Sequence, residues 1–314
     1  MSSRPSKQPN RVLAALLATM ITIGGCGADP GSGDDGILVV ATNSILADIA
    51  SNVVGEEGAV EFLIPLGGDS HDFSPSARQV ARLSEADLIL ANGLNLEENM
   101  ADVLTSLRAD GARVVELAPL VHPIPFTGEG HDDDGHEDET EDPHFWMDPI
   151  RVGEAALALA DELDEAGPGG AWHARAEGYA DEMRATDTAI ASLVGDVAES
   201  SRKMVTNHEA FGYFAARYGF EVVGAVIPGG STLAEPSSAE LADLVELMQD
   251  EGVNVIFAET SRPTTLADAV AAELGEEVEV VELFTESLGP AGSGAETLSK
   301  MLLTNAERIT AALG

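Results

Sequence analysis

The sequence predicts an α/β protein with two lobes, each built on a mostly parallel sheet flanked by helices. Short apolar segments alternate with helical segments in the first half of the chain, and the same alternation restarts after residue 200. Between the two halves, nearly thirty residues show helical spacing of apolar positions without a proline. We therefore expect two lobes that are joined by one long, rigid helix.

The first lobe is expected to span residues 37–167. Its strands are predicted from short apolar runs and its helices from apolar residues that recur at helical spacing. The strands are expected at 37–41, 60–64, 88–91 and 114–117, and the helices at 44–54, 75–83, 96–107 and 149–165. Asn43 or Ser44 fits the cap of the first helix, and Pro149 fits the first turn of the last one.

The linking helix is expected within residues 168–199, and the second lobe over residues 200–314. A Gly-Pro-Gly-Gly segment at 167–170 separates the linking helix from the one before it. In the second lobe, strands are expected at 204–206, 222–226, 255–258 and 278–283, and helices at 209–218, 239–250, 266–274 and 297–313. The repeated strand–helix order favours a second parallel sheet.

The net charge is strongly negative, because 16 Lys and Arg stand against 55 Asp and Glu, which gives −39. Such a surface repels phosphate backbones, so we expect no nucleic-acid partner. It attracts cations, but the same composition is typical of salt-adapted proteins. The charge alone therefore does not identify a metal-binding protein.

The N-terminus predicts an extracytoplasmic lipoprotein. Three basic residues precede an apolar run at residues 12–23, which is too short to span a bilayer and is typical of a secretory signal. The run ends in the sequence IGGC, which resembles a bacterial lipobox, and Cys26 is the only cysteine. We expect a signal peptide at 1–25, lipid attachment at Cys26 and a flexible, Gly-rich tether at 26–36. The alternative is a free thiol beside a general cleavage site.

Seven histidines occur in the chain: His71, His122, His131, His136, His144, His173 and His208. His131 and His136 lie in an acidic loop at about 126–142, and they are expected to bind metal only weakly because ordering such a loop costs entropy. His122 has no acidic neighbour, and His173 is expected to be exposed. Neither of these two is assigned a role.

The other three histidines lie in loops beside regular elements. His71 follows a predicted strand in PLGGDSHDFSP, His144 stands between two prolines in EDPHFWMDP, and His208 lies at a strand–helix junction in MVTNHEAFGYF. Parallel sheets bind ligands in the crevice at the carboxyl ends of their strands. Three imidazoles in one crevice would bind zinc well, and a fourth ligand would complete a tetrahedron. The spacing alone leaves open whether these histidines form a metal site.

Motifs of zinc hydrolases are absent from the sequence. His208 and Glu209 begin like the zinc-protease helix, but that motif requires a second histidine four residues after the first, and Gly212 stands there. The sequence also contains no nucleophile elbow, no phosphate-binding glycine loop and no paired-cysteine site. These absences argue against an enzyme.

The three histidine contexts together resemble the metal-receptor family of ABC importers, the zinc and manganese solute-binding lipoproteins. The similar segments are the lipobox, GGDSHDFSPSARQVARLSEADLILANGLNLE, EDPHFWMDP, NHEAFGYFAARYGFEVVGAV, EPSSAEL and FTESLGPAGSGAETL. They cover nearly all of the mature chain. The resemblance implies one metal ion in the cleft between the lobes, held by two residues from each lobe.

The resemblance also implies which residues are the ligands. His71 and His144 match the two histidines of the first lobe, and His208 matches a position that is His in zinc receptors and often Glu in manganese receptors. The fourth ligand of the family is usually Asp, in a segment after the last strand. Glu286 stands at that place here, whereas Glu282 lies within the alternation of the predicted strand.

The function implied is that of a monomeric extracytoplasmic receptor that delivers a metal ion to an ABC permease and its ATPase. We expect Zn²⁺ rather than Mn²⁺ or Fe²⁺, because imidazole nitrogen suits zinc whereas manganese prefers oxygen-rich sites. Three histidines and one carboxylate leave no open coordination position, which favours binding over catalysis. The alternatives are a manganese or iron receptor of the same type and a surface adhesin on the same fold.

Overall fold

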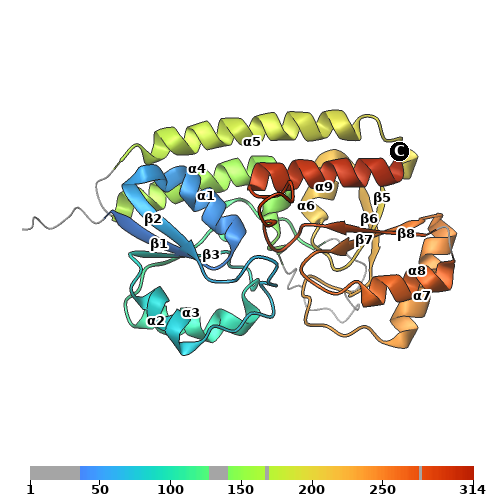
Figure 1. Cartoon of the computed structure of the whole chain (residues 1–314), viewed down its shortest axis with the longest axis horizontal. Helices are drawn as coiled ribbons and strands as arrows, with labels where there is room; N and C mark the ends of the chain where they lie inside the picture. Colours follow the sequence, from blue (N-terminus) through green and yellow to red (C-terminus); the bar gives the residue numbers. More distant parts are fainter. Residues whose placement is uncertain (1–35, 127–140, 167–169, 276–277) are drawn as a thin grey trace, which may run out of the picture. The chain divides into compact units, whose positions relative to one another are not determined.

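The computed structural model describes residues 36–126, 141–166, 170–275 and 278–314. These residues form two α/β domains, each with a four-stranded parallel sheet and flanking helices (Figure 1). The sheet orders are β2-β1-β3-β4 and β6-β5-β7-β8, so both domains repeat one topology. The strands are β1 Ile37–Ala41, β2 Gly58–Phe62, β3 Leu88–Ala91, β4 Val114–Glu116, β5 Lys203–Thr206, β6 Glu221–Ala225, β7 Val255–Glu259 and β8 Glu279–Leu283. The predicted fold is confirmed.

The inner strands are the most apolar ones. Every residue of β3 and β7 is buried, as expected for strands that are covered by helices on both faces. The described α-helices are α1 Ser44–Val54, α2 Ala77–Ser84, α3 Ala101–Ala109, α4 Pro149–Ala166, α5 Trp172–Val194, α6 Gly212–Tyr218, α7 Ser238–Glu251, α8 Thr265–Leu274 and α9 Leu298–Leu313. One core cluster draws on both domains and includes Val39, Trp146 and Phe257.

Two helices begin three or more residues later than the sequence predicted, and hydrogen-bonded turns precede both of them. The helix expected from residue 96 is preceded by a tight turn in which the Glu97 carboxylate accepts from the backbone of Asn92 and Gly93. The helix expected from residue 209 begins at Gly212 in α6. It is preceded by a tight turn in which the backbone nitrogen of Ala210 donates to the carbonyl oxygen of His208 at 2.9 Å, while the backbone nitrogen of Glu209 donates to the carbonyl oxygen of Gly229.

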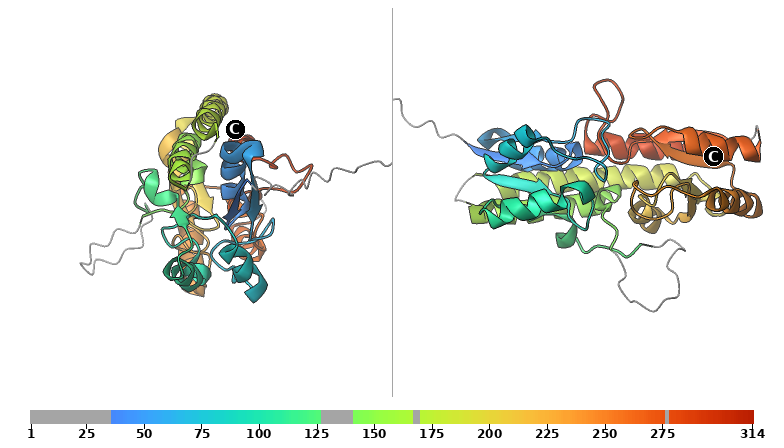
Figure 2. Two further views of the ribbon diagram at one scale, coloured as in Figure 1. Left: turned by 90° about the vertical axis from the view of Figure 1, so that its left-hand side faces the viewer. Right: turned by 90° about the horizontal axis from the view of Figure 1, so that it is seen from below.

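The long helix α5 is attached to both domains. Near its start, Tyr179 donates to Asp48 of α1 at 2.8 Å, and near its end, Asp187 accepts from Tyr218 of α6 at 3.0 Å. It lies beside α4 in both views of Figure 2. The helix ends at Val194, within the predicted range of 168–199, and the backbone nitrogen of the following Gly195 donates to the carbonyl oxygen of Ala191. The domain boundaries predicted at 167 and 199 stay predictions.

Among the described residues, no helix is both long enough and apolar enough to cross a membrane. The predicted signal peptide and Cys26 lie outside the described residues, and so do His131 and His136 of the acidic loop. Their roles therefore stay predictions.

Candidate metal site

The four predicted ligands come from four separate loops. His71 follows β2, His144 precedes the short 3₁₀ turn Phe145–Met147, His208 follows β5 and Glu286 follows β8. Three of these loops start at the carboxyl end of a parallel strand, where such sheets place their ligand sites. The first two residues belong to the N-terminal domain and the last two to the C-terminal domain.

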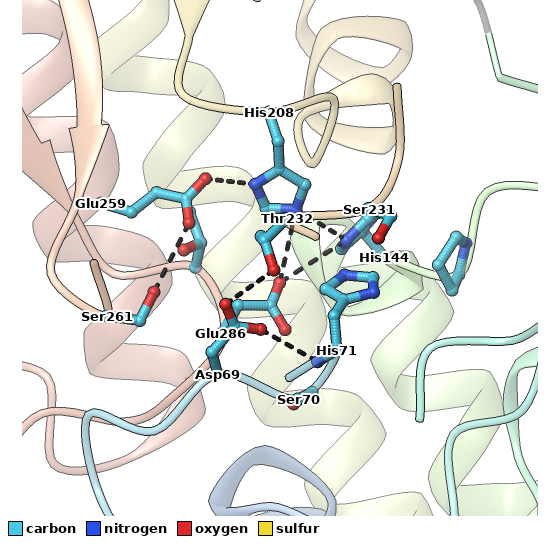
Figure 3. A network of polar contacts seen from close by, with 12 residues as sticks. Asp69, Ser70, His71, His144, His208, Ser231, Thr232, Glu259, Ser261 and Glu286 are labelled. Carbon is cyan, nitrogen blue, oxygen red and sulfur yellow. Dashed lines mark hydrogen bonds and ion pairs between the residues drawn. The ribbon is translucent and has the colours of Figure 1, made fainter. Parts of the chain in front are cut away.

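The structure brings these four side chains together. They form a cluster in which one candidate ligand atom from each residue lies within 4.8 Å of all the others. Nε2 of His144 is 3.2 Å from Nε2 of His208, and Oε1 of Glu286 is 3.5 Å from the first and 3.7 Å from the second. All four residues are at most 1% exposed. Figure 3 shows the side chains converging on one point.

Each of the three histidines has a carboxylate at its Nδ1 atom. Nδ1 of His144 is 2.8 Å from Asp142, Nδ1 of His71 is 3.2 Å from Glu98, and Nδ1 of His208 contacts Glu259. A carboxylate at Nδ1 holds one proton there, so Nε2 is the atom that binds a cation once any second proton on the ring has been displaced. The same partner also fixes the ring and makes Nε2 a better ligand. All three Nε2 atoms are therefore prepared to bind a cation.

None of these three carboxylates was predicted from the sequence. Asp142 lies two residues before His144, so the DPH sequence contained a local signal for this pair. Glu98 and Glu259 lie 27 and 51 residues from their histidines, and only the fold brings them together. The end of β7 was a weak signal for Glu259, because polar residues at strand ends often face a ligand crevice.

Local hydrogen bonds hold two of the ligand loops in place. Asp142 accepts from the backbone nitrogen of His144 at 2.8 Å, and Asp69 accepts from the backbone nitrogen of His71 at 2.9 Å. Phe145 and Trp146, which follow His144 in the chain, are fully buried. Trp146 reaches the carbonyl oxygen of Thr285, next to Glu286, at 2.9 Å. The backbone at these sites is therefore fixed before any ligand arrives.

Burial and charge compete at the site. Burial opposes ionisation of Glu286, but the neighbouring imidazoles, His144 first, lower the pKa of its carboxyl to about 2. Burial also disfavours protonation of His144, yet Asp142 and Glu286 raise its pKa to about 10. The pKa of His71 is lowered by burial. The pKa of His208 is raised, because Glu259 outweighs the effect of burial. The cluster thus keeps an ionised carboxylate among its imidazoles.

Polar atoms at the centre of the cluster lack hydrogen-bond partners. Within the part of the chain that the structure describes, both carboxylate oxygens of Glu286 and Nε2 of His71 are buried without one. A buried polar group without a partner costs free energy, and a carboxylate costs more than a neutral group. A divalent cation bound at this point would satisfy all three atoms.

The two other described histidines and Glu282 lie away from this cluster. His173 is exposed, as expected, and its Nε2 atom is 2.8 Å from Asp164. His122 is exposed and has a positive φ of 52°. Glu282 is exposed on β8, whereas Glu286 is fully buried. Of the two glutamates, only Glu286 belongs to the cluster.

The chain matches a family model and individual relatives over most of its length. The family model described as "Zinc-uptake complex component A periplasmic" matches residues 39–312. Manganese-binding lipoprotein MntA of Bacillus subtilis is 31% identical over 96% of this chain and 98% of its own. Zinc-binding protein TroA of Treponema pallidum is also 31% identical, over 96% of this chain and 98% of its own.

Solved structures agree with this result. The periplasmic zinc-binding protein TroA of Treponema pallidum superposes with a TM-score of 0.77 and covers 89% of this chain and 99% of its own. A mutant of the laminin-binding adhesin Lmb of Streptococcus agalactiae has a TM-score of 0.75 at 26% identity, over 89% of this chain and all of its own. The chain therefore belongs to the zinc-uptake component A family, the metal-binding substrate-binding proteins of ABC importers.

Proposed function

We propose that the chain captures one Zn²⁺ ion outside the cytoplasm and delivers it to an ABC permease and its ATPase. The proposed ligands are Nε2 of His71, His144 and His208, together with the carboxylate of Glu286. The observation that carries the proposal is this buried cluster of four candidate ligands. A carboxylate contacts Nδ1 of each histidine, so Nε2 is the atom through which each imidazole would bind a metal.

The distances within the cluster support a tetrahedral ion. Zinc bonds to nitrogen and oxygen of about 2.0–2.2 Å require tetrahedral ligand atoms to lie about 3.4 Å apart. The three separations measured between His144, His208 and Glu286 are 3.2, 3.5 and 3.7 Å. Small movements of these side chains therefore suffice to bind the ion.

The donor atoms favour zinc over manganese. Three nitrogens and one oxygen suit zinc, whereas manganese prefers sites rich in oxygen. Manganese is the second candidate, because the relative MntA is named for it. Both oxygens of Glu286 are buried at the site, so the carboxylate could supply a second oxygen to a larger ion.

Four protein ligands support binding rather than catalysis, because catalytic zinc keeps a position open for water or substrate. Names of relatives include lipoproteins, which supports attachment of this chain to a membrane through Cys26. The name of Lmb supports adhesion as a further candidate function on this fold. The proposed receptor works as a monomer, since each chain holds a complete ligand set.

The decisive experiment measures metal content and preference. Metal-free protein is prepared with His131 and His136 replaced by Ala, so that these two imidazoles cannot add loosely held metal. Zinc and manganese are then offered together in the presence of a competing chelator, and the bound metals are counted by elemental analysis. We expect one zinc per chain and little manganese. No bound zinc would refute the proposal, and one tightly bound manganese would identify the second candidate.

A further inference from the structure

The side chain of Asp69 connects a ligand loop of one domain to two loops of the other. Its Oδ1 atom accepts from the backbone nitrogen of His71 at 2.9 Å. Its Oδ2 atom accepts from the hydroxyl of Thr232 at 2.7 Å and from Nη1 of Arg262 at 2.5 Å. Figure 3 shows Asp69 between His71 and Thr232.

These partners are far apart in the chain. Thr232 is 163 residues from Asp69 and follows β6, and Arg262 is 193 residues away and follows β7. The Asp69 side chain is 10% exposed and that of Arg262 is 29% exposed, so solvent screens this pair only in part. One carboxylate thus spans the two domains beside the metal cluster.

The loop that carries Arg262 also leads to a second ligand. Its neighbour Ser261 donates to Oε2 of Glu259 at 3.4 Å, and Oε1 of Glu259 contacts Nδ1 of His208. The contacts therefore run from His71 in one domain to His208 in the other. Separation of the domains would break the contacts of Asp69 with Thr232 and Arg262, which hold the side chain that accepts from the His71 backbone.

We propose that Asp69, Thr232 and Arg262 form an interdomain clasp that positions His71 and sets the rate at which the bound metal leaves. The inference rests on the proposed function of metal capture. An ion held by two ligands from each domain leaves only when the domains part or a ligand loop moves away. The clasp opposes both movements, because it joins the domains and holds the His71 loop through the same side chain.

The test compares zinc dissociation rates, measured by mixing the loaded protein with an excess of a chelator that reports zinc. Asp69→Asn keeps an oxygen for the nitrogen of His71 but removes the charge that pairs with Arg262. Arg262→Gln removes the positively charged partner of the same ion pair, which belongs to the other domain. We expect each variant to release zinc at least about tenfold faster, which corresponds to about 1.4 kcal/mol. The double variant should be no faster than the faster single one, because both changes break one link.

Two further variants separate the clasp from general damage. Arg262→Lys keeps the positive charge and should restore slow release in large part. Arg108→Gln breaks an ion pair with Glu116 inside one domain and should leave the rate unchanged. If Asp69→Asn does not fold, Thr232→Val, which loses one hydroxyl, is measured in its place and should also accelerate release.

The outcomes distinguish the clasp from the function on which it rests. If the wild-type chain binds no zinc, the proposed function itself fails. If the wild-type chain binds zinc and the clasp variants release it at the wild-type rate, only the clasp is refuted. Additive effects of Asp69→Asn and Arg262→Gln would likewise overturn it, since independent sites and not one shared link would then be involved.

Discussion

Nε1 of Trp146 donates a hydrogen bond of 2.9 Å to the carbonyl oxygen of Thr285, which joins the turn after His144 to the loop before Glu286. The two residues are 139 positions apart, and the indole is fully buried. The bond therefore aligns ligands from both domains before a metal binds. Such alignment reduces the ordering cost of binding.

Trp146→Phe should weaken zinc binding while preserving an aromatic ring in the core. The variant loses one buried hydrogen bond, which is worth about 1 kcal/mol, so the affinity should fall about fivefold. Trp172→Phe is the matched control, because the described residues offer no partner to the buried Nε1 of Trp172. Chelator competition on both proteins checks the expectation. An equal loss of affinity in both would show that the bond to Thr285 does not align the site.

Glu286→Ala should weaken zinc binding by at least tenfold, about 1.4 kcal/mol, because it removes the only carboxylate in the cluster. The control is Glu282→Ala. This residue is exposed on β8, so its replacement should leave the affinity within a factor of two. Isothermal titration of the two variants makes the comparison. The assignment of the fourth ligand is wrong if Glu282→Ala has the larger effect.

Glu259→Gln should reduce zinc affinity by about 10–100-fold without touching the metal. The amide no longer stabilises the Nδ1 proton of His208 as a charged carboxylate does, and Nε2 becomes a weaker ligand. Glu251→Gln removes an exposed acid that pairs with Lys203, and it should have no such effect. If Glu259→Gln binds zinc as the wild type does, the contact serves stability alone, and thermal unfolding of the metal-free protein will reveal it.

Zinc affinity should rise with pH through neutrality. Burial opposes protonation of His144, but Asp142 and Glu286 raise its pKa to about 10 in the metal-free protein, so zinc must displace a proton at pH 7. Each time the pH is lowered by one unit, the zinc affinity should therefore fall about tenfold for each proton that zinc displaces. A cluster of unperturbed histidines would lose affinity only below about pH 6.5, and the raised pKa extends the loss to higher pH.

Protons released on zinc binding can be counted by calorimetry at pH 7.5 in buffers with different ionisation enthalpies. Release of about one proton is expected, and no release would contradict the raised pKa. The stability of the metal-free fold depends on pH in the opposite direction to the zinc affinity. Protonated His144 stabilises the metal-free fold below its ordinary pKa of 6.5, and this contribution is lost as the pH rises toward about 10.

Local patterns were sufficient to predict the fold. The apolar run that became β7 is bounded by polar residues, and nothing within it competes with a strand. Errors occurred at helix ends, where side chains and distant backbone decide the outcome. The sequence around Glu209 has the spacing of a helix, but its backbone nitrogen bonds to Gly229, twenty residues later. Such a bond leaves no local trace.

For the candidate site, the sequence predicted the four clustered side chains but not the residues that orient them. His71, His144 and His208 stand in recognisable loops, and the structure brings them together with Glu286. Most of the carboxylates that orient them could not be predicted, because nothing in the sequence distinguishes Glu98 and Glu259 from the other Asp and Glu residues, 55 in all. Arg262 meets Asp69 across 193 residues, and no periodicity relates them. Contacts of this kind can be identified only after the fold is known.

The attachment of α5 to α1 through Tyr179 and to α6 through Asp187 has a mechanical consequence. Because an unbroken helix of 23 residues joins the domains, their relative motion must bend or twist this helix instead of swinging about a slack hinge. We therefore expect the helix to resist such motion and to limit how far the two domains can separate.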